Sequence, residues 1–187
     1  MNDEIENYFE ELSDEEYNHL IEHYNLDIKQ LEKDMENYVP KIDVAYRVNC
    51  QEATYPTYNY DSDSGFDLYS TEEYTIEPFG RVLVSTGLHI DIPENHEIQV
   101  RSKSGLALKD GLMVLNSPGT VDQGYLGEIK VIMFNTSNKT VIIEKKQKVA
   151  QAVLCPVVCG KWVNLVQKDE LSSKDRNDNG FGSTGIK

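Results

Sequence analysis

The chain has 187 residues, of which 39% are hydrophobic, and a formal net charge of −14. This length allows one domain with a core plus an appendage. The chain contains no apolar run of about 18 residues and no apolar stretch near its acidic N-terminus, so we expect neither a membrane span nor a secretory signal. Residues 1–40 hold thirteen Asp/Glu against two Lys, a net of −11, whereas residues 41–187 have a net of −3. Neither part offers a basic face for duplex DNA, so stable nucleic-acid binding is not expected.

The three cysteines, Cys50, Cys155 and Cys159, are sparse and odd in number. This usage is typical of reduced cysteines in an intracellular protein. Two cysteines without a nearby histidine are too few for a zinc site, so we expect no metal at Cys155 and Cys159. The expected location is intracellular and cytoplasmic, or the interior of a host cell if the source is viral.

The acidic N-terminal extension, residues 1–40, contains a helix signal. Ser13-Asp-Glu-Glu16 has the pattern of a capping box, and apolar residues then recur at helical spacing from Tyr17 to Tyr38, just before Pro40. The pattern predicts an amphipathic helix over about 14–38. Three interpretations stay open: the helix packs on its own domain or on a neighbouring subunit, it binds a protein partner, or the segment is a mobile acidic tail.

Beyond Pro40 the apolar period changes from helical to two, as in β-strands. Turn residues separate the apolar runs, and no second long helix is indicated, so we predict an all-β sandwich or barrel over 41–171, followed by a C-terminal arm over 172–187. The predicted strands are at 42–46, 82–84, 88–92, 98–100, 112–116, 129–134, 140–143, 149–154 and 157–166.

Two short polar segments are candidate phosphate or metal sites. In segment 61–70, Gly65 permits a tight bend and Asp67 lies beside it. Asp67 is either a turn carboxylate that binds backbone or a carboxylate that faces the water shell of Mg²⁺, an ion that tends to keep its waters. Segment 101–109 places two hydroxyls, two cations and a glycine within five positions, which suits a phosphate cradle.

Segment 111–134 has two apolar strands around a loop rich in Gly, Pro, Asn and Asp, and such loops often carry function. Asp122 is a candidate general base and Tyr125 a candidate platform for a sugar. The alternative is an ordinary hairpin with a charged tip. In segment 148–154, Gln151 is the one uncharged polar residue among apolar ones, so it is either hydrogen-bonded in the core or points outward.

The last residues, 176–186, hold glycines, hydroxyls, one arginine and one aromatic ring. Such a segment can wrap a polyphosphate with backbone N–H and hydroxyl donors while its ring covers a base. Gly180 to Gly185 also spells G-x-G-x-x-G, but the dinucleotide fingerprint needs a strand before it and a helix after it. We therefore predict an arm that closes over a ligand.

Together, these five segments, in this order and with these gaps, resemble the trimeric dUTP pyrophosphatase (dUTPase) family over residues 42–187. The similarity is greatest in Val114–Lys130 and in Phe181–Gly185. The resemblance implies a distorted jelly-roll β-barrel or sandwich that hydrolyses dUTP to dUMP and diphosphate with Mg²⁺. This reaction limits uracil incorporation into DNA and supplies dUMP for thymidylate synthesis. The resemblance also implies a homotrimer whose active sites lie between subunits, each covered by another subunit's arm.

The resemblance assigns roles to individual positions. Asp122 would activate the attacking water, Gln151 would lie beside the α-phosphate, and Asp67 would reach Mg²⁺ through water. Phe181 would stack over the uracil. The other residues implied to bind the nucleotide are Asn116, Gly119, Thr120, Val121, Tyr125 and Lys130 for the base and sugar, and Lys103, Ser104, Gly105, Arg176, Gly182, Ser183 and Thr184 for the phosphates.

The chain departs from the family pattern at three places. Lys103 and Lys148 stand where many members have arginine, which keeps the charge but loses the bidentate fork. Residues 177–179 replace a more glycine-rich stretch. Two other functions stay open: a dCTP deaminase, which shares the fold, and a nucleotide-gated interaction protein that uses the extension 1–40 to bind a partner.

Overall fold

The computed structural model describes residues 13, 41–175 and 177–179. The predicted helix over 14–38 lies outside the described residues, as do Arg176, Phe181, Gly182, Ser183 and Thr184 of the predicted arm. The chain divides into two units, Met1–Asp43 and Val44–Lys187, and the description below concerns the second.

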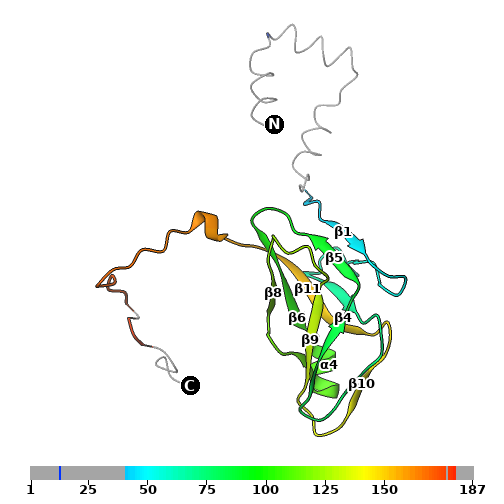
Figure 1. Ribbon diagram of the computed structural model, residues 1–187. Helices are drawn as coiled ribbons and strands as arrows, with labels where there is room; N and C mark the ends of the chain where they lie inside the picture. Colours follow the sequence, from blue (N-terminus) through cyan, green and yellow to red (C-terminus); the bar gives the residue numbers. More distant parts are fainter. Residues whose placement is uncertain (1–12, 14–40, 176, 180–187) are drawn as a thin grey trace. The chain divides into compact units, whose positions relative to one another are not determined.

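The second unit is mostly β-strand (Figure 1). Its described helices are one short α-helix, α4 (Ser104–Asp110), and one 3₁₀ turn, η1 (Gly160–Trp162). None of the described helices is long and apolar enough to cross a membrane. The strands are β1 (Ala45–Val48), β2 (Phe66–Tyr69), β3 (Tyr74–Ile76), β4 (Arg81–Ser85), β5 (Leu88–Asp91), β6 (His96–Ser102), β7 (Leu112–Val114), β8 (Gly119–Val121), β9 (Lys130–Asn135), β10 (Val141–Ile143) and β11 (Lys148–Pro156).

The strands form four separate antiparallel sheets. The largest has the order β2-β11-β6-β8, a second has the order β4-β9-β7, and two pairs join β1 to β5 and β10 to β3. The prediction of a mostly-β protein is confirmed, and the arrangement is consistent with a jelly roll. The strands of the described part do not close into a barrel, however, because hydrogen bonding is interrupted between these sheets.

Alternation along the central strands builds the core. In β6, Ile98 and Val100 are buried, whereas Gln99 and Arg101 between and beside them face the other side of the sheet. Val131 and Met133 of β9 belong to the same buried cluster, so the two larger sheets share one core. Burial of each such side chain contributes about 1.5–3 kcal/mol, which holds the two sheets together.

Three features of the fold differ from the sequence prediction. Strands β2, β3 and β8 were not predicted from the sequence. Helix α4 was also not predicted, and it has no buried residue. The predicted strand over 157–166 is wrong, because only the turn η1 is regular there, and Leu165 is 91% exposed. Its apolar alternation has no partner strand among the described residues of this chain.

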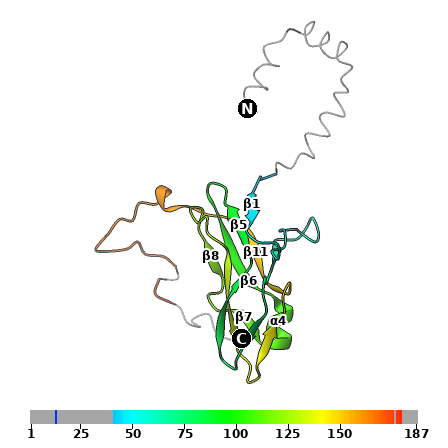
Figure 2. The same ribbon diagram turned by 45° about the vertical axis from the view of Figure 1, so that its right-hand side comes forward.

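Helix α4 lies at one end of the strands in both views, between β6 and β7 (Figures 1 and 2). It ends at Gly111, whose φ of 68° is left-handed and favours glycine. A Cβ at Gly111 would lie 2.9 Å from Thr136 Oγ1, so glycine is also required by packing. At its other end, α4 begins two residues after the last residue of β6, within the segment that the sequence predicts to cradle phosphate.

Candidate active site

One group of predicted site residues lies on the outer face of the four-stranded sheet. Gln151 of β11 lies opposite Asp67 of β2 on one side and opposite Arg101 of β6 on the other. Directly opposed residues of antiparallel strands point to the same face, so these three side chains form a row. They line a cavity of about 420 Å³, which Lys103 and Lys148 also line. Three basic residues thus surround a single polar cavity.

The carboxylate of Asp67 joins the two lysines. Its Oδ1 accepts a hydrogen bond from Lys103 Nζ, and its Oδ2 lies 2.6 Å from Lys148 Nζ. Asp67 is 8% exposed, whereas the side chains of Lys103 and Lys148 are 25% and 41% exposed. Burial opposes the charge of Asp67, but the hydrogen bonds from Lys103 and Lys148 outweigh it and lower the pKa of Asp67 below its ordinary value. The hydrogen bond to Asp67 in turn raises the pKa of Lys148, so Asp67 and Lys148 are both charged at neutral pH.

Contacts at Gly65 and Gln151 hold the strands of this row together. A Cβ at Gly65 would lie 2.7 Å from the carbonyl oxygen of Ala152, so only glycine lets β2 begin this close to β11. Gln151 is half-buried, and its Nε2 donates to the carbonyl oxygen of Ser102 at 3.3 Å. Of the two alternatives for Gln151, the structure thus shows an outward-facing side chain that is also hydrogen-bonded.

Ser104 and Gly105 open helix α4 and are exposed. N–H groups in the first turn of a helix have no partner within the helix, so they remain available to a ligand. A Cβ at Gly105 would meet no atom within 4 Å. No described residue of this chain therefore requires glycine at position 105, whereas a ligand that approaches the backbone closely would.

The second group of predicted residues lies in and around the connection from β8 to β9. These two strands do not pair with each other as the strands of a hairpin would, because β8 pairs with β6 and β9 pairs with β4 and β7. We name the cavity that this group lines the hairpin cavity, after the hairpin considered for this segment from its sequence. Asn116, Thr120, Val121, Asp122, Tyr125 and Lys130 all line one cavity of about 340 Å³, together with Leu83, Glu128, Ile129 and Ile132. Gly119 pairs with Val100, and a Cβ at Gly119 would lie 3.2 Å from Asn116 Nδ2. Glycine at this position therefore gives the Asn116 amide room to lie against the strand.

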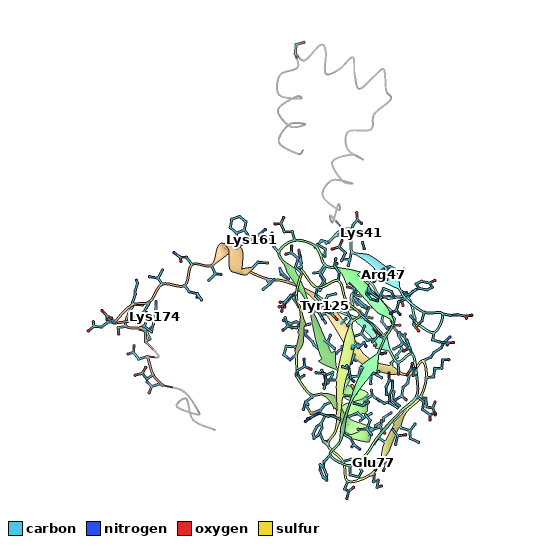
Figure 3. The ribbon with its side chains drawn as sticks, in the orientation of Figure 1. Lys41, Arg47, Glu77, Tyr125, Lys161 and Lys174 are labelled. Carbon is cyan, nitrogen blue, oxygen red and sulfur yellow. The ribbon has the colours of Figure 1, made fainter. Side chains whose placement is uncertain are left out.

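The turn that follows Asp122 is closed by Tyr125. The Tyr125 N–H donates to the carbonyl oxygen of Asp122, and the Tyr125 hydroxyl donates to that of Glu128, each at 2.9 Å. A Cβ at Gly127 would lie 2.4 Å from the Tyr125 hydroxyl oxygen, so glycine leaves room for the ring. Figure 3 labels Tyr125 on the strand domain. The Asp122 carboxylate is exposed, lines the hairpin cavity and makes no hydrogen bond or ion pair with another described residue.

The structure brings each group together but does not join the two groups. The hairpin cavity and the cavity around Asp67 have no lining residue in common. Sequence reasoning did not single out Asn59 or Asp63, which also line the cavity around Asp67; Asn59 Nδ2 lies 3.4 Å from Asp67 Oδ2. Both belong to a polar loop whose sequence has no periodic signal, so only the fold could find them.

Mg²⁺ is the metal that the family resemblance implies, and the described residues suit contact with it through its bound waters. No group of three or more His, Cys, Asp or Glu side chains in the described part could hold a metal ion directly. Asp67 accepts hydrogen bonds from Lys103 and Lys148, but a carboxylate has about four lone-pair sites and can also accept from water. The residues therefore suit a metal carried by a ligand and contacted through its waters.

Known proteins of one family resemble this chain. A family profile described as dUTPase matches residues 51–185. The deoxyuridine 5'-triphosphate nucleotidohydrolase of Hydrogenobaculum sp. (strain Y04AAS1) is 52% identical over 138 residues, which are 73% of this chain and 94% of that protein.

Solved structures of phage dUTPases are also similar. The dUTPase of Staphylococcus bacteriophage 80alpha with dUPNHPP has a TM-score of 0.70 and 25% identity, and the match covers 78% of this chain and all of that one. A mutant dUTPase from phage phi11 of S. aureus, described with a structural Mg(II) ion, has a TM-score of 0.64 and 23% identity, and covers 71% of this chain and all of its own. From the extent of the profile match and the identity to the bacterial relative, this chain belongs to the dUTPase family.

Proposed function

We propose that the protein hydrolyses dUTP to dUMP and diphosphate, and thereby limits uracil incorporation into DNA and supplies dUMP for thymidylate synthesis. One observation carries this proposal. The hairpin cavity brings an uncommitted carboxylate, Asp122, together with an amide, Asn116, and an aromatic ring, Tyr125, in a chain half identical to a relative named for this reaction.

In this proposal the hairpin cavity provides the site for the base and the sugar. Its extended backbone from Gly119 to Val121, with Asn116 and Lys130, offers donors and acceptors to a flat uracil. A backbone acceptor for uracil N3–H would face a lone pair in cytosine, and a close-fitting wall excludes the 5-methyl group of thymine. Mismatches that leave buried polar groups unpaired can discriminate by about 10⁴. The Tyr125 ring, held by its bond to Glu128, packs against C2′ of the sugar and excludes a ribose hydroxyl.

Asp122 acts as the general base in this proposal. Its carboxylate takes a proton from a water molecule, whose oxygen attacks the α-phosphorus in line as the bond to the diphosphate leaving group breaks. Gln151 lies beside the α-phosphate and the water. General-base catalysis typically contributes about 10²–10⁴ in rate. Most of the remaining acceleration comes from positioning and from neutralising phosphate charge, as in phosphoryl transfer generally.

The cavity around Asp67 receives the triphosphate. Lys103, Lys148 and Arg101 line it and bring positive charge, and Ser104 and Gly105, which follow Lys103 at the start of α4, add hydroxyl and backbone donors. Asp67 fixes both lysine side chains before substrate arrives. Ordering a long side chain on binding costs about 0.5–1.5 kcal/mol, so this clamp reduces the cost of binding phosphate.

Asp67 would contact the water shell of Mg²⁺, the cofactor, which the triphosphate would carry to the site. The ion would supply charge neutralisation on the phosphates.

A homotrimer completes the site. A nucleotide joins its base to its phosphates, yet the hairpin cavity and the cavity around Asp67 share no residue within this chain. A neighbouring copy therefore supplies one half of each site. The C-terminal segment also exposes large apolar side chains that a neighbouring subunit can cover: Val158, Leu165, Val166 and Leu171 are 71%, 91%, 64% and 86% exposed.

The arm and the extension have separate roles in this proposal. The arm, residues 172–187, closes over the site of another subunit, with Arg176, Ser183, Thr184 and the backbone of Gly182 on the γ-phosphate and Phe181 over the uracil. Closure excludes water from the reaction. The extension 1–40 lies outside the catalytic domain, which begins at about residue 41, and binds a protein partner or another subunit. The enzyme acts in the cell interior.

The first test measures diphosphate release by the purified protein with Mg²⁺ from dUTP, dCTP, dTTP and UTP side by side. We expect release from dUTP alone, which tests the reaction and the selection of base and sugar together. Ammonia released from dCTP would instead indicate a deaminase. Binding of dUTP without turnover of any nucleotide would contradict the proposal and favour a regulatory, nucleotide-gated role.

A further inference from the structure

Asn95, in the turn between β5 and β6, connects three segments of the chain. Its N–H donates to Gln123 Oε1 at 3.0 Å, its carbonyl oxygen accepts from the Val157 N–H at 2.8 Å, and its Oδ1 accepts from Trp162 Nε1 at 3.1 Å. Its φ is 61°, a left-handed value that asparagine tolerates better than most residues. This backbone conformation lets one residue present all three groups at once.

The segments that Asn95 joins matter for the site. Gln123 follows Asp122 directly, and Val157 to Trp162 form the first part of the C-terminal segment, just beyond β11. Figure 3 shows Lys161 on the short turn η1, where this segment leaves the strands. Asn95 thus ties the loop that carries Asp122 to the beginning of the segment that leads to the arm.

A cavity of about 410 Å³ separates these two parts. Asp122, Gln123 and Gly124 line one side of it, and residues 157–160 line another. Asp122 also lines the hairpin cavity, so its loop has the base site on one side and the C-terminal segment on the other. Gln123 Oε1 accepts the Asn95 N–H at 3.0 Å, and the Cys159 thiol approaches the same oxygen across this cavity at 3.7 Å, so the bond to Asn95 is the shorter of these two contacts.

The other contacts of η1 are weaker anchors. Lys161 pairs with Glu94, and its Nζ lies 5.4 Å from the centre of the Trp162 ring, but the side chains of Lys161 and Glu94 are 48% and 63% exposed. Exposed ion pairs contribute little. Trp162 is itself 68% exposed, so burial does not fix its ring. The hydrogen bond to Asn95 therefore sets the orientation of η1.

We propose that Gln123 and Asn95 are positioning residues: they hold the Asp122 loop at its working distance from the substrate and tie it to η1. The inference rests on the proposed role of Asp122. A misplacement of about 1 Å can cost about 10²-fold in rate, so releasing the loop should lower kcat more than it raises KM.

The test compares Gln123→Met with Gln123→Glu. Methionine has similar length but cannot accept the Asn95 N–H, whereas glutamate can. We expect Gln123→Met to lower kcat for dUTP by about 10- to 100-fold with little change in KM, and Gln123→Glu to restore most of it. Lys161→Met is the control within the same turn: it removes the exposed ion pair, leaves the bonds of Asn95 intact, and should keep kcat within about twofold.

A second readout does not depend on activity. Trp162 is the only tryptophan in the sequence, so intrinsic tryptophan fluorescence reports η1 directly. Gln123→Met should shift Trp162 emission and increase its quenching by acrylamide in the absence of nucleotide, and Gln123→Glu should not.

Two outcomes overturn the inference. If wild type hydrolyses dUTP and Gln123→Met keeps full kcat, the positioning role is wrong while the proposed function stands. If Trp162 fluorescence is the same in wild type and Gln123→Met, the tie to η1 is wrong. If wild type has no activity at all, the proposed function fails, and the fluorescence comparison still decides whether Gln123 and η1 are linked.

Discussion

Replacing Asp67 by asparagine should destabilise the protein, because one buried carboxylate holds two ammonium groups. A charge-assisted hydrogen bond contributes about 1.5–3 kcal/mol, but an exposed ion pair contributes only about 0–1 kcal/mol. Lys103 is 25% exposed and Lys148 is 41% exposed, so their bonds to Asp67 fall toward the lower values. We expect Asp67→Asn to lower the free energy of unfolding by about 2 kcal/mol at pH 7, since the asparagine also turns a donor toward one lysine.

The effect should depend on pH in a defined direction. The pKa of Asp67 is lowered by its hydrogen bonds to Lys103 and Lys148, which outweigh its burial, so its contribution is present above the unfolded pKa of about 3.9 and is lost as the pH falls through the folded value. The pKa of Lys148 is raised by its hydrogen bond to Asp67, so its contribution is lost only as the pH rises through a value above its usual range of about 10.4. The difference between wild type and Asp67→Asn should therefore be full between about pH 5 and 10 and shrink below about pH 4.

Urea unfolding at one fixed protein concentration measures this difference, since oligomer stability depends on concentration. Asp63→Asn is the matched control. Asp63 lines the same cavity, but among the described residues its carboxylate accepts only the Tyr60 N–H, at 3.0 Å, and asparagine can still accept it. The control should change stability by less than about 0.5 kcal/mol. Equal urea midpoints for wild type and Asp67→Asn at pH 7, or a difference that persists unchanged at pH 3, would refute the reasoning.

Three further predictions concern activity. Asp122→Asn should still bind a non-hydrolysable dUTP analogue but lower kcat by about 10²–10⁴, and normal turnover would show that Asp122 is not the base. Gly105→Ala should leave the urea midpoint unchanged, because the added Cβ meets no atom within 4 Å, but it should raise KM for dUTP. In contrast, Gly65→Ala should lower the free energy of unfolding by about 1–3 kcal/mol, because its Cβ would lie 2.7 Å from the Ala152 carbonyl oxygen. Ending the chain at residue 171 should lower kcat/KM by about 10²-fold or more while the mass of the proposed trimer in light scattering stays the same, and an unchanged kcat/KM would remove the arm from the mechanism.

Strand periodicity predicted part of the fold well. Strands β6, β9 and β11 have six to nine residues and alternate in burial or are continuously apolar, so their sequence carries a clear signal. Strand β2 was missed because three of its four residues, Asp67 among them, are buried and no alternation appears. Segment 157–166 has the apolar pattern of a strand but no partner strand among the described residues, and a strand exists only where another chain segment completes its hydrogen bonds.

The candidate site was predicted residue by residue but not as an arrangement. Asn116, Asp122 and Tyr125 lie close together along the chain, so their grouping around one cavity follows from local sequence. The contacts of Asp67 with Lys103 and Lys148 depend on the pairing of β2 with β11 and of β11 with β6. Pairing of distant strands is set by the packing of the whole core, and a sequence read segment by segment does not contain it.

The sequence by itself determined the family, the mostly-β character and the chemical groups available for catalysis, because these depend on residue types, their order and their local spacing. Only the tertiary structure decided that Asp67 clamps two lysines, that Asn95 joins the Asp122 loop to η1, and that the hairpin cavity and the cavity around Asp67 share no lining residue. Each of these depends on side chains from distant segments meeting at hydrogen-bonding distance, and the packing of the sheets around one core fixes those distances.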